Sequence, residues 1–410
     1  MQAGSNPSLS HQKALLLSSG GGWSSERDTY TKFENPIFSL RVQNGNVILE
    51  THGNQIQIKG NPIKILENFL EKKYYAVGYF GYEFYRFIEQ DFTPAPHKNG
   101  ADFPDAHFLF FNEIAEKKTK TRKNNCNNKS FLNEEISPNQ NMTKSQYTNM
   151  IEKARSYIKQ GDIYQVNLSQ KFRFPLKIPL QKFLSRLYEE QPVPFACYLD
   201  FGKFQIVSGS MELFLRKKGQ KLVTKPIKGT RKRGSSEKED KELYSELRRS
   251  EKEQAENLMI VDLMRNDLGR VCEFGSVEVN NLFKIECYST LYQMVSEVEG
   301  TLRKQATTGD ILQATFPPGS VTGAPKRRAM EIIDELEPHL RGPYCGAIGF
   351  FEPSGDFTLS VAIRVIVNEG NEGMFWAGGG IVWDSVPDQE YKETLIKSRA
   401  TMKTLNGEKI

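Results

Sequence analysis

The sequence predicts an α+β protein in which extended antiparallel sheet is packed against helices on its outside. Three observations support this fold class. Runs of alternating apolar and polar residues, typical of strands, recur along the chain, as in FSLRVQNGNVILET (residues 38–51). Long stretches with helical spacing follow later, at roughly 238–268, 324–337 and 388–405. We find no short-period repeat.

The first 122 residues are expected to form strands around one helix. FSLRVQNGNVILET and YYAVGYFGYEFYRF (74–87) alternate like strands, and PIKILENFLEKK (62–73) between them has helical spacing. From residue 116 the chain reads EKKTKTRKNNCNNKS, which is polar and has almost no apolar residue. We therefore predict an N-terminal region over 1–122 and a polar linker or loop over 123–142.

Residues 143–405 are predicted to form the functional core. A helix should begin at Thr143 or Ser145 and end near Gly161. Strands are expected in YQVNLSQKFRF, PFACYLDFGKFQIVSGS and MELFLRKKGQKLVTKPI. At the end of the last of these, proline and glycine in PIKGT predict a tight turn, in which Lys228 has no evident structural task.

Composition argues against several classes of protein. The net charge is +5, and the basic residues are interleaved with acids, which is typical of solvated helix faces and not of a nucleic-acid-binding surface. The five cysteines form no CxxC pair, so neither a disulfide framework nor a zinc site is expected. Nothing resembles a Ser/His/Asp or Cys/His arrangement. No apolar run could span a bilayer, and the run near the start is too short for a signal peptide, so we expect a cytoplasmic protein.

Two helices carry pairs of glutamates at helical spacing. Glu253 and Glu256 lie in RRSEKEQAENLMIVDLMRNDLG, and Glu390 and Glu393 in PDQEYKETLIKSRATM. Residues at i and i+3 share a helix face, so each pair can direct two carboxylates to one place. Such pairs are usually solvated. If the two helices met, however, four carboxylates would repel one another unless a hard cation such as Mg²⁺ lay between them.

Two stretches could bind an anion. In LSVAIRVIV the alternation places Leu359 and Val367 on one face and Arg364 with Ser360 on the other. Arg364 either faces water or offers its fork to a carboxylate. FWAGGGIVWDS has three consecutive glycines, which indicate either a sharp turn or a close approach of the backbone to a ligand. The residues alone thus suggest a Mg²⁺-assisted enzyme for a small carboxylated substrate.

The combination of motifs is more specific than any one of them. PIKGTRKRG, AENLMIVDLMRNDLG, FPPGSVTGAPKRRAMEIID, YCGAIGFF, AIR, AGGGIV and EYKETLIKSRA occur in this order. Over about residues 143–405 the chain thereby resembles the chorismate-utilising enzymes, which include anthranilate, aminodeoxychorismate, isochorismate and salicylate synthases. The resemblance implies an α+β fold of stacked antiparallel sheets around a deep site for Mg²⁺ and chorismate.

The resemblance also assigns roles to residues of this chain. By position, Glu256 and Glu393 match the Mg²⁺ ligands of the family, and Glu253 and Glu390 match residues that support the ion through water.

The substrate contacts are carried over in the same way. Tyr344 and Arg364 match contacts to the enolpyruvyl carboxylate of chorismate. Gly378 and Gly380 match the backbone groups that meet the ring carboxylate, with Lys397 close by, and Thr230 matches the threonine of the turn.

A few positions discriminate between members of the family. The resemblance implies that members which use water need a lysine base at the position of Gln165 to activate it. Gln165 cannot take a proton, which argues against isochorismate synthesis. Anthranilate-forming members usually have alanine in place of Lys228, whereas the PIKGT form is typical of aminodeoxychorismate synthases. Glu212 matches the general acid/base of those enzymes, and Gln293 replaces a histidine common in the family.

The resemblance therefore implies amination of chorismate to 4-amino-4-deoxychorismate, a precursor of p-aminobenzoate and folate. Anthranilate formation is the alternative. The implied cofactor is Mg²⁺. The implied partner is a separate glutamine amidotransferase subunit that delivers ammonia, because none of the five cysteines is accompanied by a catalytic histidine.

Overall fold

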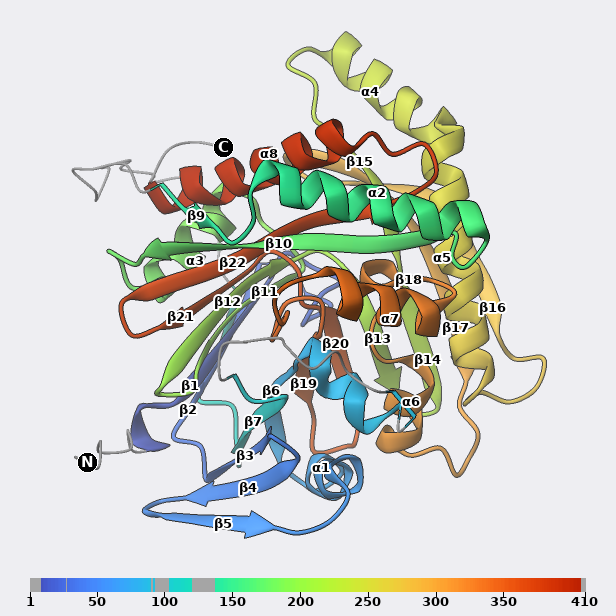
Figure 1. Cartoon of the computed structure of the whole chain (residues 1–410). Helices are drawn as coiled ribbons and strands as arrows, with labels where there is room; N and C mark the ends of the chain where they lie inside the picture. The colour runs from blue at the N-terminus through green and yellow to red at the C-terminus, as the bar shows by residue number, and fades with distance from the viewer. Residues whose placement is uncertain (1–8, 27, 90, 93–102, 120–136, 407–410) are drawn as a thin grey trace.

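The computed structural model of the chain describes residues 9–26, 28–89, 91–92, 103–119 and 137–406. Eight α-helices and three short 3₁₀ helices lie in these ranges (Figure 1). The α-helices are α1 (Pro62–Leu70), α2 (Lys144–Gln160), α3 (Leu180–Glu190), α4 (Glu237–Arg249), α5 (Glu251–Gly269), α6 (Thr308–Thr315), α7 (Lys326–Leu336) and α8 (Pro387–Asn406). The 3₁₀ helices are η1 (Leu9–His11), η2 (Tyr82–Phe87) and η3 (Gly319–Val321).

The strands form two large antiparallel sheets, as the α+β prediction requires. The ten-stranded sheet has the order β18 (Gly323–Ala324), β10 (Gln165–Pro175), β22 (Glu372–Ile381), β21 (Val365–Glu369), β12 (Phe204–Ser210), β11 (Phe195–Asp200), β1 (Lys13–Ser18), β2 (Thr29–Glu34) and β8 (Glu116–Thr119), with β9 (Asn139–Gln140) on β10.

The twelve-stranded sheet contains both N-terminal and C-terminal strands. Its order is β15 (Ile227–Lys232), β17 (Leu291–Thr301), β14 (Lys221–Lys225), β13 (Leu213–Lys218), β20 (Phe357–Val361), β19 (Ala347–Phe351), β6 (Tyr75–Phe80), β7 (Ala106–Phe111), β3 (Phe38–Gln43), β4 (Asn46–Thr51) and β5 (Asn54–Ile58), with β16 (Glu278–Cys287) on β17.

Strands from the N-terminal region pair with strands of the predicted core in both sheets. β1 pairs with β11, and β6 pairs with β19. The predicted linker at 123–142 lies mostly outside the described residues, and the boundary at 122 remains a prediction from composition.

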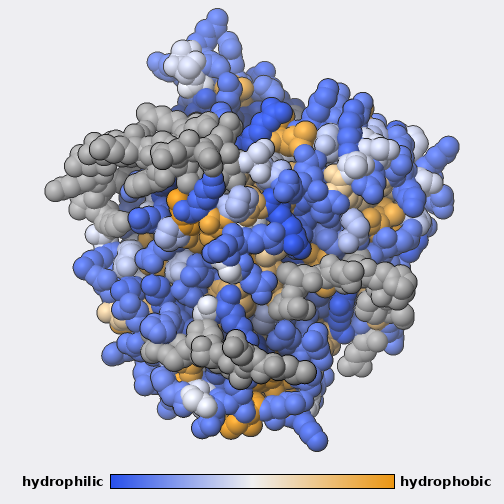
Figure 2. Space-filling view, turned by 60° about the vertical axis from the view of Figure 1, so that its left-hand side comes forward, coloured by the Kyte–Doolittle hydropathy of each residue, from blue (hydrophilic) through white to orange (hydrophobic). Residues whose placement is uncertain are grey.

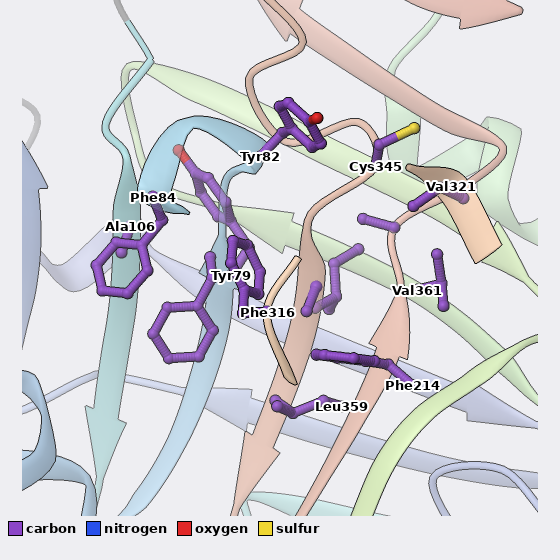
Figure 3. Close-up of a cluster of buried hydrophobic side chains, with 14 of the residues drawn as sticks. Tyr79, Tyr82, Phe84, Ala106, Phe214, Phe316, Val321, Cys345, Leu359 and Val361 are labelled. Atoms are coloured by element: carbon purple, nitrogen blue, oxygen red, sulfur yellow. The ribbon is translucent and has the colours of Figure 1, made fainter. Parts of the chain in front are cut away.

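The core between the sheets is rich in aromatic side chains. Tyr79, Phe84, Phe214 and Phe316 lie close to one another in it, together with aliphatic residues such as Leu359 (Figure 3). Phe80 packs on Phe84 with ring centroids 5.1 Å apart. Burial of this apolar surface is the main favourable term in the folding of both sheets.

The surface is mainly hydrophilic on the face shown in Figure 2, where hydrophobic residues appear in small separate groups. Within the described ranges, none of the helices combines the length and the apolar character that crossing a bilayer requires.

Local sequence signals explain most of the helix ends. α2 confirms the predicted helix: the Thr143 hydroxyl accepts a hydrogen bond from the Gln146 N–H, and Gly161 closes the helix at a φ of 83°. The single helix expected over 238–268 is instead two helices, because Ser250 ends α4 and caps α5 with its side chain.

Candidate active site

The candidate site lies where the chain passes from one sheet to the other. β20 belongs to the twelve-stranded sheet and β21 to the ten-stranded sheet, so residues 362–364 make the crossing. Beside the crossing is a cavity of about 470 Å³. Six of the residues predicted from the sequence line it: Lys228, Tyr344, Arg364, Gly378, Gly380 and Lys397.

The prediction of one continuous strand through LSVAIRVIV was wrong. β20 ends at Val361 and β21 begins at Val365, and Arg364 between them has a φ of 51°. The apolar alternation of the sequence continues across the break because both segments are strands, but the two strands belong to different sheets. This break turns Arg364 into the cavity, where its Nη1 donates to the Gln191 side-chain oxygen at 2.6 Å.

The three glycines lie in β22, beyond the point where β21 stops. β21 pairs with β22 as far as Phe375, whereas β10 follows β22 on its other side to Ile381. The Gly378 carbonyl accepts a hydrogen bond from Lys397 Nζ at 2.7 Å. Because the backbone groups of successive residues alternate between the two edges of a strand, the N–H groups of Gly378 and Gly380 point to the same edge as this carbonyl. The structure therefore presents a glycine edge suited to an anion.

Packing also restricts two of these glycines, Gly378 against backbone and Gly380 against the end of a side chain. A Cβ on Gly378 would lie 2.2 Å from the Leu168 carbonyl oxygen, and a Cβ on Gly380 would lie 2.7 Å from the Gln165 amide nitrogen. Gln165 is fully buried, and neither end of its side-chain amide has a hydrogen-bond partner among the described residues.

Lys228 reaches the cavity because of an irregularity in β15. The tight turn expected at PIKGT is a register shift between Ile227 and Thr230, with Gly229 at a φ of 82°. A bulge of this kind redirects the neighbouring side chain. Lys228 Nζ lies 3.4 Å from the Ser320 carbonyl oxygen, and desolvation lowers the pKa of its ammonium, against the opposing effects of Glu256 and Glu212.

Glu212 lies behind this lysine. It is 5% exposed, and burial raises its pKa to about 7, against the opposing effects of the Ser320 side chain and the Lys228 ammonium. A carboxyl group with such a pKa can both give and take a proton near neutral pH. The charges of Glu212 and Lys228 act on one another, and of the two only Lys228 lines the cavity.

Tyr344 and Thr230 differ in their placement. Tyr344 is buried at the cavity, its ring stacks on Trp376 with centroids 5.8 Å apart, and burial raises its phenol pKa. It therefore stays a hydrogen-bond donor. Thr230 is exposed on β15 opposite Gln293, outside the cavity lining in the described part of the chain.

The four predicted carboxylates come from two helices that are both anchored to sheet. Next to Glu256, Asn257 of α5 accepts a hydrogen bond from Ser296 Oγ of β17 at 2.5 Å. Next to Glu393, Thr394 of α8 accepts one from Gln170 Nε2 of β10 at 2.6 Å.

The charges of these two helices act on one another. Desolvation raises the pKa of Glu256, and the charge of Glu393 raises it further. Desolvation likewise raises the pKa of Glu390, and the same Glu393 adds to the effect. The carboxylates are thus close enough to repel.

The four carboxylates are not gathered into a ready-made ligand set. Among the described residues, no group of three or more His, Cys, Asp or Glu side chains is assembled to hold a metal ion. Glu393 is paired with Lys397 at 2.7 Å, and Glu253 with Arg231 at 3.3 Å. The oxygen donors and their mutual repulsion would suit a hard divalent cation.

Sequence reasoning missed one whole wall of the cavity. Phe183 and Leu187 of α3 line it, and Gln191 at the end of α3 holds Arg364. The signal was present, because Leu180, Phe183, Leu184 and Leu187 have helical spacing and are all buried.

The crossing of the two sheets and the cavity beside it define an α+β protein whose candidate site is lined by Lys228, Arg364 and Lys397. Over residues 13–403 the chain matches the family described as chorismate binding enzyme, and it belongs to that family.

The relatives carry two different activities. The chain is 45% identical over 265 residues to anthranilate synthase component 1 of Aquifex aeolicus, a match that covers 65% of this chain and about half, 54%, of that protein. It is 36% identical to aminodeoxychorismate synthase component 1 of Bacillus subtilis, with 90% of this chain and 87% of that protein covered. The crystal structure of anthranilate synthase component I from Streptococcus pneumoniae superposes with a TM-score of 0.78 at 27% identity, covering 98% and 94% of the two chains.

Proposed function

We propose that this protein aminates chorismate at position 4, which gives 4-amino-4-deoxychorismate, the activity of an aminodeoxychorismate synthase component 1. The observation that carries the proposal is the placement of Lys228 in the cavity with Glu212 behind it. An amine and an acid/base side by side suit a substitution in which a hydroxyl leaves and nitrogen enters.

Chorismate has two carboxylates, and the cavity offers two places for them. The Arg364 guanidinium and the Tyr344 hydroxyl would hold the enolpyruvyl carboxylate. The backbone N–H groups of Gly378 and Gly380 would hold the ring carboxylate, with Lys397 beside them. This double attachment fixes the ring relative to Lys228.

The carboxylates of α5 and α8 would complete the site. We propose that Glu256 and Glu393 hold Mg²⁺ directly and that Glu253 and Glu390 support it through water. When bound, the ion would neutralise the ring carboxylate and the glutamates at the same time.

The proposed chemistry has two steps on this chain's own residues. The neutral amine of Lys228 adds to position 2 of the ring, both ring double bonds shift, and the hydroxyl at position 4 leaves as water with a proton from Glu212. Ammonia then adds at position 4, both double bonds shift back, and the bond to Lys228 breaks with its electron pair returning to the amine, while Glu212 takes the proton from the incoming nitrogen. The pKa shifts of both groups support these roles, because Lys228 must be neutral and Glu212 protonated at the start.

The nitrogen would enter as ammonia. Burial raises the pKa of Cys197 and of Cys345 to about 12, so both are thiols and poor nucleophiles. We propose that the chain alone uses free ammonium and that a separate glutamine amidotransferase subunit supplies ammonia from glutamine.

The second candidate is anthranilate formation, which the names of several relatives favour. The purified chain with chorismate, Mg²⁺ and ammonium distinguishes the two, with the product identified by mass and ultraviolet spectrum. We expect 4-amino-4-deoxychorismate. Anthranilate as the main product would refute the proposal and leave the second candidate.

A further inference from the structure

A fully buried ion pair lies behind the cavity wall and has no part in the chemistry above. The side chains of Arg341 and Glu337 are 1% and 0% exposed. Arg341 Nε and Nη2 donate to the two carboxylate oxygens of Glu337 at 2.9 and 2.7 Å. The guanidinium also lies over the ring of Tyr82, 4.6 Å from its centroid.

The remaining donors of Arg341 join two segments that are far apart in the sequence. Nη2 donates to the Asn167 carbonyl of β10 at 2.7 Å, and Nη1 to the Val321 carbonyl of η3 at 3.0 Å. Both Asn167 and Val321 line the cavity. Figure 3 shows Tyr82 and Val321 at the same end of the buried cluster. The rigid guanidinium of Arg341 therefore sets the distance between β10 and η3 on two sides of the cavity.

Glu337 holds β10 at a second residue. Its Oε1 accepts hydrogen bonds from the Ser169 N–H at 2.7 Å and the Ser169 hydroxyl at 2.9 Å. Ser169 is the cross-strand partner of Gly378, whose backbone forms the glycine edge.

The same ion pair is linked to Lys228 and to Tyr344. Val321 follows Ser320, whose carbonyl oxygen is the contact of Lys228 Nζ. The Tyr344 N–H donates to the Arg341 carbonyl at 3.1 Å, and the N–H of Arg341 donates to Glu83 at 2.7 Å. Tyr344 is thus bonded directly to Arg341, whereas Lys228 is linked to it through Val321 and Ser320.

Stability alone does not call for an ion pair at this place. Replacing a buried ion pair with apolar side chains of similar volume is often neutral or stabilising, whereas removing one partner is strongly destabilising. What apolar side chains cannot do is hold two carbonyl oxygens and a serine at set distances.

We propose that Arg341 and Glu337 are positioning residues for the substrate cavity, which set the separation of β10 and η3 and thereby the geometry of Lys228, Tyr344 and the glycine edge. The proposal rests on the proposed function in one respect, that chorismate is the molecule bound.

The test compares a double variant with a matched control. Arg341→Met with Glu337→Leu removes both charges, and Arg41→Met with Glu50→Leu does the same to a partly buried pair on β3 and β4. For each protein we would measure Tm, the chorismate Kd from tryptophan fluorescence, and kcat/KM with ammonium. We expect both double variants to stay folded. kcat/KM should fall about 100-fold in the Arg341/Glu337 variant alone, since a displacement near 1 Å has effects of this size.

Arg341→Lys supplies a second measurement in case the double variant does not fold. It keeps a cation beside Glu337 but cannot bridge both carbonyls, so chorismate affinity should weaken about tenfold at temperatures well below its Tm. Wild-type Kd and kcat/KM in folded Arg341 variants would overturn the inference. Absence of chorismate binding by the wild type would overturn the proposed function, and the inference with it.

Discussion

The carboxyl group of Glu212 interacts with the ammonium of Lys228 in the cavity lining, and each opposes the effect of burial on the pKa of the other. Burial raises the pKa of Glu212 and lowers that of Lys228, while the attraction between the two charged forms acts in the reverse sense on both. Burial is the larger effect in each case, so it shifts Glu212 towards the protonated acid and Lys228 towards the neutral amine. This is the protonation state that the proposed first step needs.

The raised pKa of Glu212 predicts how stability depends on pH. Because the folded state binds this proton more tightly than the unfolded state, the free energy of unfolding falls as pH rises from the ordinary pKa of 4.5 through about 7. Glu212→Gln removes this dependence and should make the protein more stable than wild type at pH 8 by up to about 3 kcal/mol, with little difference at pH 4. Urea unfolding at several pH values measures it, and parallel pH curves for the two proteins would count against a buried, titrating Glu212.

Replacing a glutamate of the proposed metal site should change thermal stability differently with and without Mg²⁺. In excess chelator, Glu256→Gln should raise Tm because it removes a charge that burial disfavours more than the ammonium of Lys228 favours it. In millimolar Mg²⁺ the wild type should gain stability and Glu256→Gln should gain little. Glu251→Gln, at the exposed start of the same helix, is the control and should respond to Mg²⁺ like the wild type. A Glu256 variant with a full Mg²⁺ response would remove this residue from the metal site.

The three glycines of β22 should not be equivalent. Gly378→Ala places a Cβ 2.2 Å from the Leu168 carbonyl and should cost about 1–3 kcal/mol, because β10 and β22 must separate. At Gly379 the nearest atom to a Cβ is a Glu390 oxygen at 3.4 Å, so Gly379→Ala should keep wild-type stability. Chemical denaturation of both variants gives the comparison. Equal losses of stability in the two variants would contradict the explanation that contact with the Leu168 carbonyl restricts Gly378.

Much of this arrangement could be predicted from local signals. Caps predicted α2, because Thr143 and Gly161 have the chemistry that a helix start and end require. Alternation predicted strands on both sides of Arg364, but it could not show that they belong to different sheets, because the pattern of a strand records which residues face a core and not which sheet they join.

The misses have a common cause, which is tertiary contact. In α5 the apolar Leu258 is 50% exposed, whereas the polar Asn257 beside it is buried and accepts a hydrogen bond from Ser296. The roles of Arg341 and Glu337 were not foreseen either, since their partners on β10 lie about 170 residues away along the chain. Contacts of that separation leave no periodic signal in the sequence.

The proposed covalent bond between Lys228 and the substrate can be tested directly. Wild-type protein incubated with chorismate and Mg²⁺ but without ammonia should accumulate an adduct on Lys228, because the first step can proceed and the second cannot. Peptide mass mapping would locate the adduct. Lys228→Met should not form it. The control is Lys221→Met, which changes an exposed lysine on β14 and should still form the adduct. The account predicts an adduct on Lys228 alone and loss of 4-amino-4-deoxychorismate formation in Lys228→Met. An adduct-free wild type together with normal rate and product in Lys228→Met would contradict it.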